Sequence, residues 1–290
     1  MEIDNPPAVR TVGRILERKG ALDGKRRVRR PAPPRGWHIP DVASEKAELD
    51  SFDTVEGLVI KDGPHVEVLN GVSLHGGLPV SKPCKKACTA DMVMQELCRH
   101  WREFGLPGYA QFDNHPIFHG PHHYKNVVGR VSRMCMSLGV TPVFAPQYET
   151  GFQAAVESYN GRWQEKVWAR FHFDSLEQVQ EQSDKYVRAY RSRIAERIKS
   201  APERAAFPKD REPDFNAALT GKMIYIRRTN ERGSVSILGH AFEVDPHWPH
   251  RLVRAVVDFD HYRISFYALR RKNPNKQPLL LQADYRLKYD

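Results

Sequence analysis

The chain has 290 residues, 40% of them hydrophobic, and a formal net charge of +10. This apolar content is enough for a folded core, so a wholly disordered chain is excluded. No apolar run reaches the ~18 residues of a membrane span, and the N-terminus has no hydrophobic signal segment, so we expect neither membrane insertion nor secretion. Four cysteines are too few for a disulfide scaffold, and we expect a cytoplasmic protein.

The positive charge is concentrated at the two ends of the chain. Residues 1–40 and 221–290 each carry a net charge of +6, residues 41–170 carry −2, and residues 171–220 are balanced. This distribution indicates a polyanionic partner, with the acidic residues of the middle serving another purpose. A protein that merely has charged tails is the alternative.

Residues 1–40 predict a helix followed by an extended basic linker. Val9, Val12, Ile15 and Leu16 fall on one helical face, and Gly20 ends the helix. The segment resembles the end of a helix-turn-helix domain whose beginning is missing. A basic segment at residues 25–35 follows, and its prolines exclude a helix. We therefore expect an extended linker suited to following a chain of phosphates. Its predicted DNA-binding residues are Lys25, Arg26, Arg27, Arg29 and Arg30.

Residues 41–200 predict strands that alternate with helices. An antiparallel hairpin or three-strand meander is expected first, followed by a helix from residue 90 that Thr89 caps. The segment GYAQF predicts a short strand, residues 127–138 a helix, and TPVFA another strand. Two helices follow, one from residue 154 and a long amphipathic one from residue 175.

After a proline-bearing linker at residues 201–220, residues 221–290 contain short strands separated by turns. This pattern predicts a small, basic, five-stranded barrel. Its basic side chains include Arg227, Arg228, Arg270 and Arg271, and we expect them to bind a polyanion such as a nucleic acid.

Three carboxylates occupy positions that local structure explains poorly: Asp50 in the first predicted strand, Asp113 at a strand end, and Glu157 on a helix. If they converge, their repulsion would favour a bound divalent cation, and oxygen ligands prefer Mg²⁺ or Mn²⁺. Two such ions suit phosphoryl transfer. Each residue also has a simpler explanation: a solvent-facing strand position, a turn starter, or a helix surface charge.

The motifs around these carboxylates resemble those of bacterial insertion-sequence transposases with an integrase catalytic core, a group related to retroviral integrases. The matching segments are AELDSF, QFDNHPIF and FQAAVESYNGRW, within a resemblance that covers about residues 46–200. His115 replaces the usual glycine after Asp113-Asn114, and the spacing from Asp113 to Glu157 is longer than usual. Asp53 competes with Asp50 as the first carboxylate, and Asp50 is preferred because AELD matches the family's strand.

The resemblance implies an α/β fold with a ribonuclease H-like catalytic core, a mixed sheet flanked by helices. It implies metal-dependent cleavage of double-stranded DNA at transposon ends and strand transfer into target DNA. Asp50, Asp113 and Glu157 would hold Mg²⁺ or Mn²⁺, with two ions expected. Gln153 and Asn160, one turn either side of Glu157, would face the DNA together with Asn114. The family also implies at least a homodimer on DNA and a bacterial, nucleoid-associated location.

Two other functions remain open from the sequence. One is a DNA-binding transposase remnant that keeps the core but lacks a complete end-recognition domain, and the other is a simple ribonuclease H-type nuclease.

Three other groups of residues give weaker signals. A zinc site at Cys84 and Cys88 is not favoured, because no second pair of cysteines follows. The histidines between His115 and His123 predict a solvated, DNA-facing loop. Trp163 and Trp168 are expected in the core.

Overall fold

The computed structural model describes residues 7–21, 32–121, 124–147, 149, 151–208 and 218–287. The chain divides into two compact units, Met1–Ala32 and Pro33–Asp290. In the first unit the predicted helix is confirmed as α1 (Val9–Arg18), and none of its residues is buried. The basic residues predicted between Lys25 and Arg30 to bind DNA lie outside the described residues.

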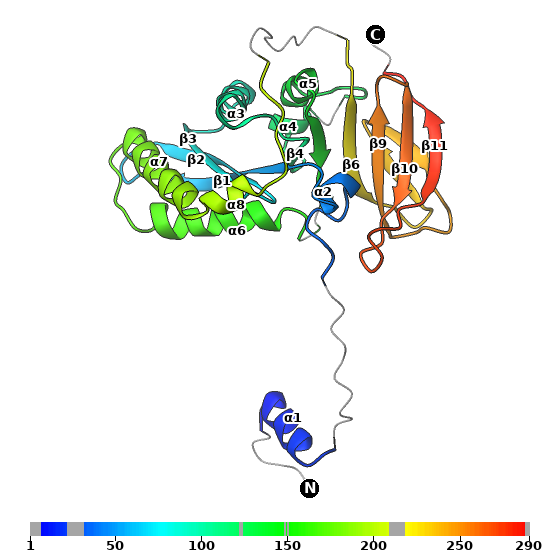
Figure 1. The fold of residues 1–290 in the computed structure, drawn as a ribbon, viewed down its shortest axis with the longest axis horizontal. Coiled ribbons are helices and arrows are strands. Elements are labelled where there is room, and N and C mark those ends of the chain that lie inside the picture. The colour runs from blue at the N-terminus through cyan, green and yellow to red at the C-terminus, as the bar shows by residue number, and fades with distance from the viewer. Residues whose placement is uncertain are drawn as a thin grey trace. The chain divides into compact units, whose positions relative to one another are not determined.

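A nine-stranded mixed sheet organises the second unit (Figure 1). The strand order is β11-β10-β9-β6-β5-β4-β1-β2-β3. The first three strands form the predicted antiparallel meander, and β4 and β5 run parallel to β1. The strands of this part are β1 (Leu49–Val59), β2 (His65–Ser73), β3 (Pro79–Lys85), β4 (Tyr109–Phe112) and β5 (Thr141–Phe144).

Helices cover both faces of this sheet, so the predicted class, a mixed sheet flanked by helices, is confirmed (Figure 1). Trp101 on α3 packs against Phe52 on one face, whereas Trp163 on α6 packs with Val55 and Val66 on the other. The helices are α2 (Pro40–Ala43), α3 (Ala90–Phe104), α4 (Pro116–His119), α5 (Arg130–Ser137), α6 (Ala154–Trp163), the π-helix η1 (Gln164–Trp168), α7 (Leu176–Arg193) and α8 (Ala195–Lys199).

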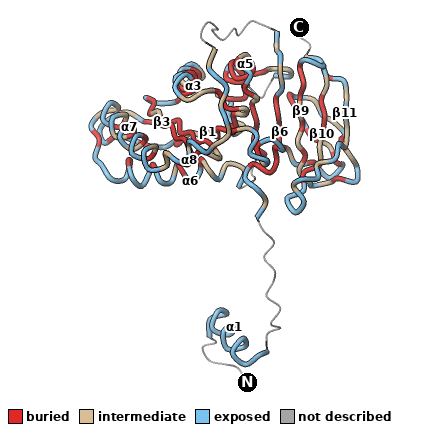
Figure 2. Tube along the Cα trace, viewed as in Figure 1, coloured by how far each residue is buried: buried red, intermediate tan, exposed pale blue. Residues whose placement is uncertain are grey.

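Local sequence signals explain where several of these helices begin and end. Thr89 caps α3 by accepting a hydrogen bond from the Met92 backbone N–H (3.3 Å), and Gly105 ends the helix at a φ of 84°. Trp163 is fully buried and the partly buried Trp168 stacks on it with ring centroids 6.5 Å apart, so both pack in the core as predicted. Buried residues, red in Figure 2, run along the strands of the sheet.

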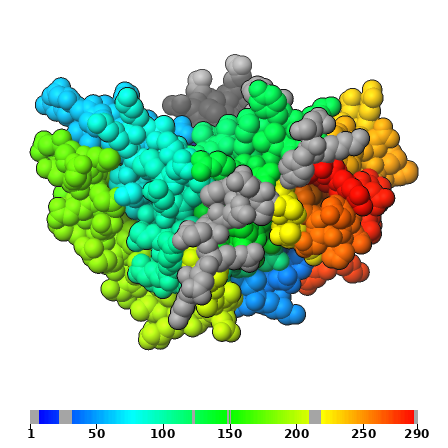
Figure 3. All heavy atoms as spheres, turned by 90° about the horizontal axis from the view of Figure 1, so that it is seen from above, coloured from blue at the N-terminus to red at the C-terminus, as the bar shows by residue number. Residues whose placement is uncertain are grey.

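The C-terminal strands extend the central sheet. β6 (Lys222–Arg228) pairs in parallel with β5, and β9 (Leu252–Asp258), β10 (Arg263–Ala268) and β11 (Leu279–Asp284) follow in antiparallel order. β7 (Ser234–Ile237) and β8 (His240–Glu243) form a separate hairpin. In the space-filling view these strands, yellow to red, adjoin the green central part of the chain directly (Figure 3).

The predicted five-stranded barrel at residues 221–290 is not confirmed. The described C-terminal residues form six strands: four continue the core sheet, and the β7–β8 hairpin packs on them through contacts such as that of Phe242 with Phe266. The sheet continues because β6 forms hydrogen bonds with β5, and Ile224 and Ile226 pack with Val143 in a shared apolar cluster. Within the described residues, no helix is long and apolar enough to cross a membrane.

Candidate active site

Two adjacent parallel strands bring two acidic side chains together: Asp53 lies within β1, and Asp113 directly follows β4. β1 and β4 pair with Leu49 opposite Tyr109 and Ser51 opposite Gln111. Continuing this offset by two residues sets Asp53 level with Asp113, on the same face of the sheet. Asp53 is therefore the strand residue that stands beside Asp113.

Glu157 completes the acidic group from the first turn of α6, which crosses this face of the sheet. Burial, together with the smaller effects of the Asp113 and Glu157 charges, raises the pKa of Asp53 to about 6, against the hydrogen bonds from Thr54 and Asn160 that lower it. The pKa of Asp113 is also raised, chiefly by burial. Asp53 and Asp113 thus share a partly desolvated region that opposes their ionisation, and the exposed Glu157 lies close enough for its charge to act on Asp53.

Asp50, predicted as the first carboxylate, belongs to a different part of the molecule. Its side chain points to the opposite face, where it accepts a hydrogen bond from Trp101 Nε1 (3.0 Å) and forms a bidentate ion pair with Arg204. Asp50 is 1% exposed, and this pairing is structural. The prediction was wrong because residues 50 and 53 differ in strand parity and so face opposite sides of the sheet.

Arg204 lies in the stretch predicted to be a linker. Its neighbour Ala205 forms reciprocal backbone hydrogen bonds with Leu106, which tie this segment to the end of α3. Residues 201–208 are therefore packed on the core, in contrast to the prediction, and residues 209–217 lie outside the described residues.

A row of polar side chains holds Asp53 in place. Asn160 donates from Nδ2 to Asp53 Oδ2 (2.8 Å) and accepts from Asn70 Nδ2 (2.9 Å). Asn70 in turn accepts from Ser81 Oγ (2.7 Å), which also bonds Tyr159 Oη (2.8 Å). Asp53, Asn70 and Ser81 are register partners across β1, β2 and β3.

The predicted roles of Asn160 and Gln153 change accordingly. Both lie one turn from Glu157 as expected, but the Asn160 amide bonds inward to Asp53 and Asn70 instead of facing outward. Gln153 donates to the Phe52 backbone oxygen (3.2 Å) and lines the cleft beside the carboxylates. Asn70 and Ser81 were missed from the sequence, although a polar Asn within the apolar run of β2 is a detectable signal.

An open cleft of about 580 Å³ lies beside Asp113 and Glu157. Its lining includes two of the three carboxylates and several polar groups from neighbouring loops: Asp113, Asn114, His115, Ala145, Pro146, Gln147, Glu149, Gln153 and Glu157. As the side chains stand, the described residues contain no group of three or more His, Cys, Asp or Glu positioned to hold a metal ion.

Arg227, predicted to contact DNA, is turned toward the protein. Its guanidinium donates to Asn114 Oδ1 (2.7 Å) and to the backbone oxygens of Ala145 (3.3 Å) and Ile226 (2.8 Å), and it lies over the Tyr225 ring. Burial lowers its pKa to about 10. Arg227 therefore anchors the Asp113-Asn114 turn to β6.

The other predicted DNA-binding residues have different surroundings. Arg228 pairs with Glu149 and donates to the His250 backbone oxygen. Arg270 and Arg271 are exposed on the β10–β11 loop.

The predicted solvated histidine loop is only partly described. His115 is exposed beside the cleft, but His119 is 8% exposed and packs against the rings of Phe144 and Tyr225, so it belongs to the core. His122 and His123 lie outside the described residues. Cys84 and Cys88 are both buried and free of disulfides.

The Asp53 pKa predicts a pH effect on stability in metal-free protein. A folded-state pKa near 6 against an ordinary value of 3.8 means that proton binding favours folding, so this stabilisation is present at low pH and lost as the pH rises through 6. Asp53→Asn mimics the protonated form. The free energy of unfolding of the variant minus that of the parent protein, measured with urea in EDTA, should therefore rise from about pH 4 to 7. A difference that stays constant over this range would contradict the raised pKa of Asp53.

Comparisons with known proteins give structural similarities only. No family model matches the chain, and no curated protein matches it. A chain of the simian T-cell lymphotropic virus intasome in complex with PP2A regulatory subunit B56 gamma is 12% identical, with a TM-score of 0.42 over 83% of this chain and 74% of that one.

Two retroviral catalytic cores are similarly distant. The catalytic core domain of BIV integrase is 17% identical with a TM-score of 0.36, over 47% of this chain and 79% of that one. The HTLV-2 integrase catalytic core domain in complex with magnesium is 15% identical with a TM-score of 0.36, over 48% of this chain and 81% of that one. At these values the similarities bear on neither activity nor site residues.

Proposed function

We propose that this chain catalyses metal-dependent cleavage and joining of DNA strands, as a polynucleotidyl transferase of the transposase and integrase type. The observation that carries the proposal is the alignment of Asp53 with Asp113 on parallel strands, with Glu157 on the helix that crosses them. The sequence resemblance to insertion-sequence transposases supports a reaction at the ends of a mobile element. Action on two ends would require at least a dimer.

The donor atoms of this group suit Mg²⁺ or Mn²⁺. They are carboxylate oxygens, and the pKa of Asp53 is raised by burial and, to a smaller extent, by the charges of Asp113 and Glu157, which a cation would offset. Asp53, Asp113 and Glu157 would hold the metal, and the exposed Glu157 side chain would have to turn toward the other two. A bound divalent ion supplies Lewis-acid polarisation of the phosphoryl group and a more acidic water.

The protein's own residues orient the carboxylates. Asp53 Oδ1 accepts from the Thr54 backbone N–H (2.9 Å) and Oδ2 accepts from Asn160, so the plane of the carboxylate is fixed. Asp113 Oδ1 accepts from the His115 backbone N–H (3.0 Å). Arg227 immobilises the adjoining Asn114. Such pre-ordering lowers the cost of assembling the reactive geometry.

A strand-cleavage assay tests the proposal. A labelled duplex with the terminal sequence of the cognate element should be nicked at its end in Mg²⁺ or Mn²⁺, and the new 3′ end should then be joined to a plasmid. EDTA should abolish both steps. Cleavage that persists in EDTA, or cleavage of RNA–DNA hybrids in preference to duplex DNA, would refute the proposal.

A further inference from the structure

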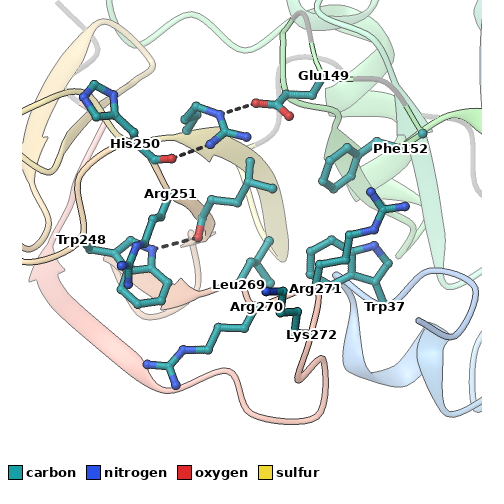
Figure 4. A pocket seen from close by; sticks show the side chains of 13 residues that line it. Trp37, Glu149, Phe152, Trp248, His250, Arg251, Leu269, Arg270, Arg271 and Lys272 are labelled. Atoms are coloured by element: carbon teal, nitrogen blue, oxygen red, sulfur yellow. Dashed lines mark hydrogen bonds and ion pairs between the residues drawn. The ribbon is translucent and has the colours of Figure 1, made fainter. Parts of the chain in front are cut away.

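A second cleft of about 590 Å³ lies between the loop that precedes α6 and the loops of the C-terminal strands (Figure 4). Trp37, ahead of α2, and Phe152, ahead of α6, form one side. Trp248, His250 and Arg251 approach from the loop before β9. Its volume is in the range of sites that hold small organic groups, about 300–1,000 Å³.

The lining of this cleft is strongly cationic. It is lined by five cationic side chains and a single carboxylate, Glu149, which is already paired with Arg228. Arg271 and Lys272 are exposed and form no ion pair with another described residue. The cations are Arg228, Arg251, Arg270, Arg271 and Lys272. The cleft therefore favours an anion.

The floor of the cleft is apolar and aromatic. Leu269 is buried there, and Phe152 is half-buried with its ring centroid 5.8 Å from that of Trp37. Both guanidinium groups that flank Trp248, those of Arg251 and Arg270, lie within 5.1 Å of its ring centroid. Phe152 is thus the aromatic ring left accessible for stacking.

This combination matches an unpaired nucleotide better than a duplex. In double-stranded DNA both faces of each base are covered by neighbouring bases, and only phosphates and groove edges are presented. An unpaired strand offers phosphates to a cationic rim and a bare base to an aromatic floor. An acidic peptide would satisfy the cations but gain little from the ring of Phe152.

The cleft also adjoins the candidate active site. Glu149 lines both clefts, and residues 151–153 pass from Phe152 in one to Gln153 in the other. A strand whose end lay near Asp113 could therefore extend into this second cleft without leaving the protein surface.

We propose that this cleft binds single-stranded DNA, holding unpaired nucleotides of a strand that leads to or from the candidate active site. The assignment of DNA as the polymer rests on the proposed function. Arg271 and Lys272 bind phosphate, and Phe152 stacks on a base.

A binding assay with a fluorescent oligothymidylate of about 12 nucleotides tests this proposal. Its affinity for the full chain is measured by fluorescence anisotropy in EDTA. The double variant Arg271→Glu/Lys272→Glu should weaken binding at least about tenfold more than the control Arg232→Glu/Lys276→Glu, which changes the same charge at exposed positions outside the cleft. Phe152→Leu should weaken oligothymidylate binding about fivefold and leave blunt-duplex binding unchanged.

Urea midpoints equal to that of the parent protein would establish that the variants fold. Three results would each overturn the proposal. The cleft and control variants could lose equal affinity, or Phe152→Leu could weaken single-stranded and duplex DNA binding equally. Polyglutamate could also compete as strongly as oligothymidylate. The binding assay contains no metal and so does not depend on catalysis. If oligothymidylate binds normally but the strand-cleavage assay shows no activity, only the proposed function is refuted.

Discussion

Asp53→Asn is expected to reduce Mg²⁺-dependent strand cleavage at least about a thousandfold, since it removes an anionic metal ligand that contributes several kcal/mol to the transition state. The folded structure should persist, because the single amide oxygen of Asn can still accept one of the two hydrogen bonds, from Asn160 or from the Thr54 backbone N–H. The assay is single-turnover nicking of the labelled duplex.

Two matched variants make this result interpretable. Asp62→Asn changes the same charge in the exposed β1–β2 turn, at a φ of 55° that asparagine tolerates, and should leave cleavage unchanged. Asp50→Asn should lower stability while its folded fraction retains cleavage. A variant of Asp53 with normal activity, or an Asp50 variant that is stable but inactive, would return the first carboxylate to Asp50.

Arg204→Ala is expected to destabilise the fold by about 3–5 kcal/mol, because it leaves the carboxylate of Asp50 buried without its countercharge. The side chains of Arg204 and Asp50 are only 11% and 2% exposed, so little water can replace the pair. Urea unfolding followed by circular dichroism measures the change.

Lys199→Ala is the surface comparison. It breaks the exposed ion pair between Lys199 and Glu196 and should cost no more than about 1 kcal/mol. The double variant Asp50→Leu/Arg204→Met should recover much of the loss, because it removes both buried charges together. An Arg204→Ala variant as stable as Lys199→Ala would show that Asp50 is solvated or neutral.

Much of the core could be predicted because its signals are local. Alternation of apolar residues marked the meander, and Thr89 and Gly105 marked the ends of α3. Asp113 and Glu157 were identified because a strand end and a helix turn are visible in sequence. Their roles as metal ligands remain a proposal.

Other features depended on contacts between residues that are distant in sequence. Choosing between Asp50 and Asp53 required the β1–β4 register, which sets Asp50 opposite Ala110 and leaves Asp53 to meet Asp113. The ion pair between Asp50 and Arg204 spans 154 positions. The pairing of β6 with β5, which joins the C-terminal strands to the core sheet, is equally non-local.

Anomalous diffraction from crystals soaked in Mn²⁺ tests the metal assignment most directly. The account predicts manganese peaks among the carboxylates of Asp53, Asp113 and Glu157, and their loss in Asp53→Asn crystals. Crystals saturated with Mn²⁺ that show no peak there, or a peak at Asp50 instead, would contradict it.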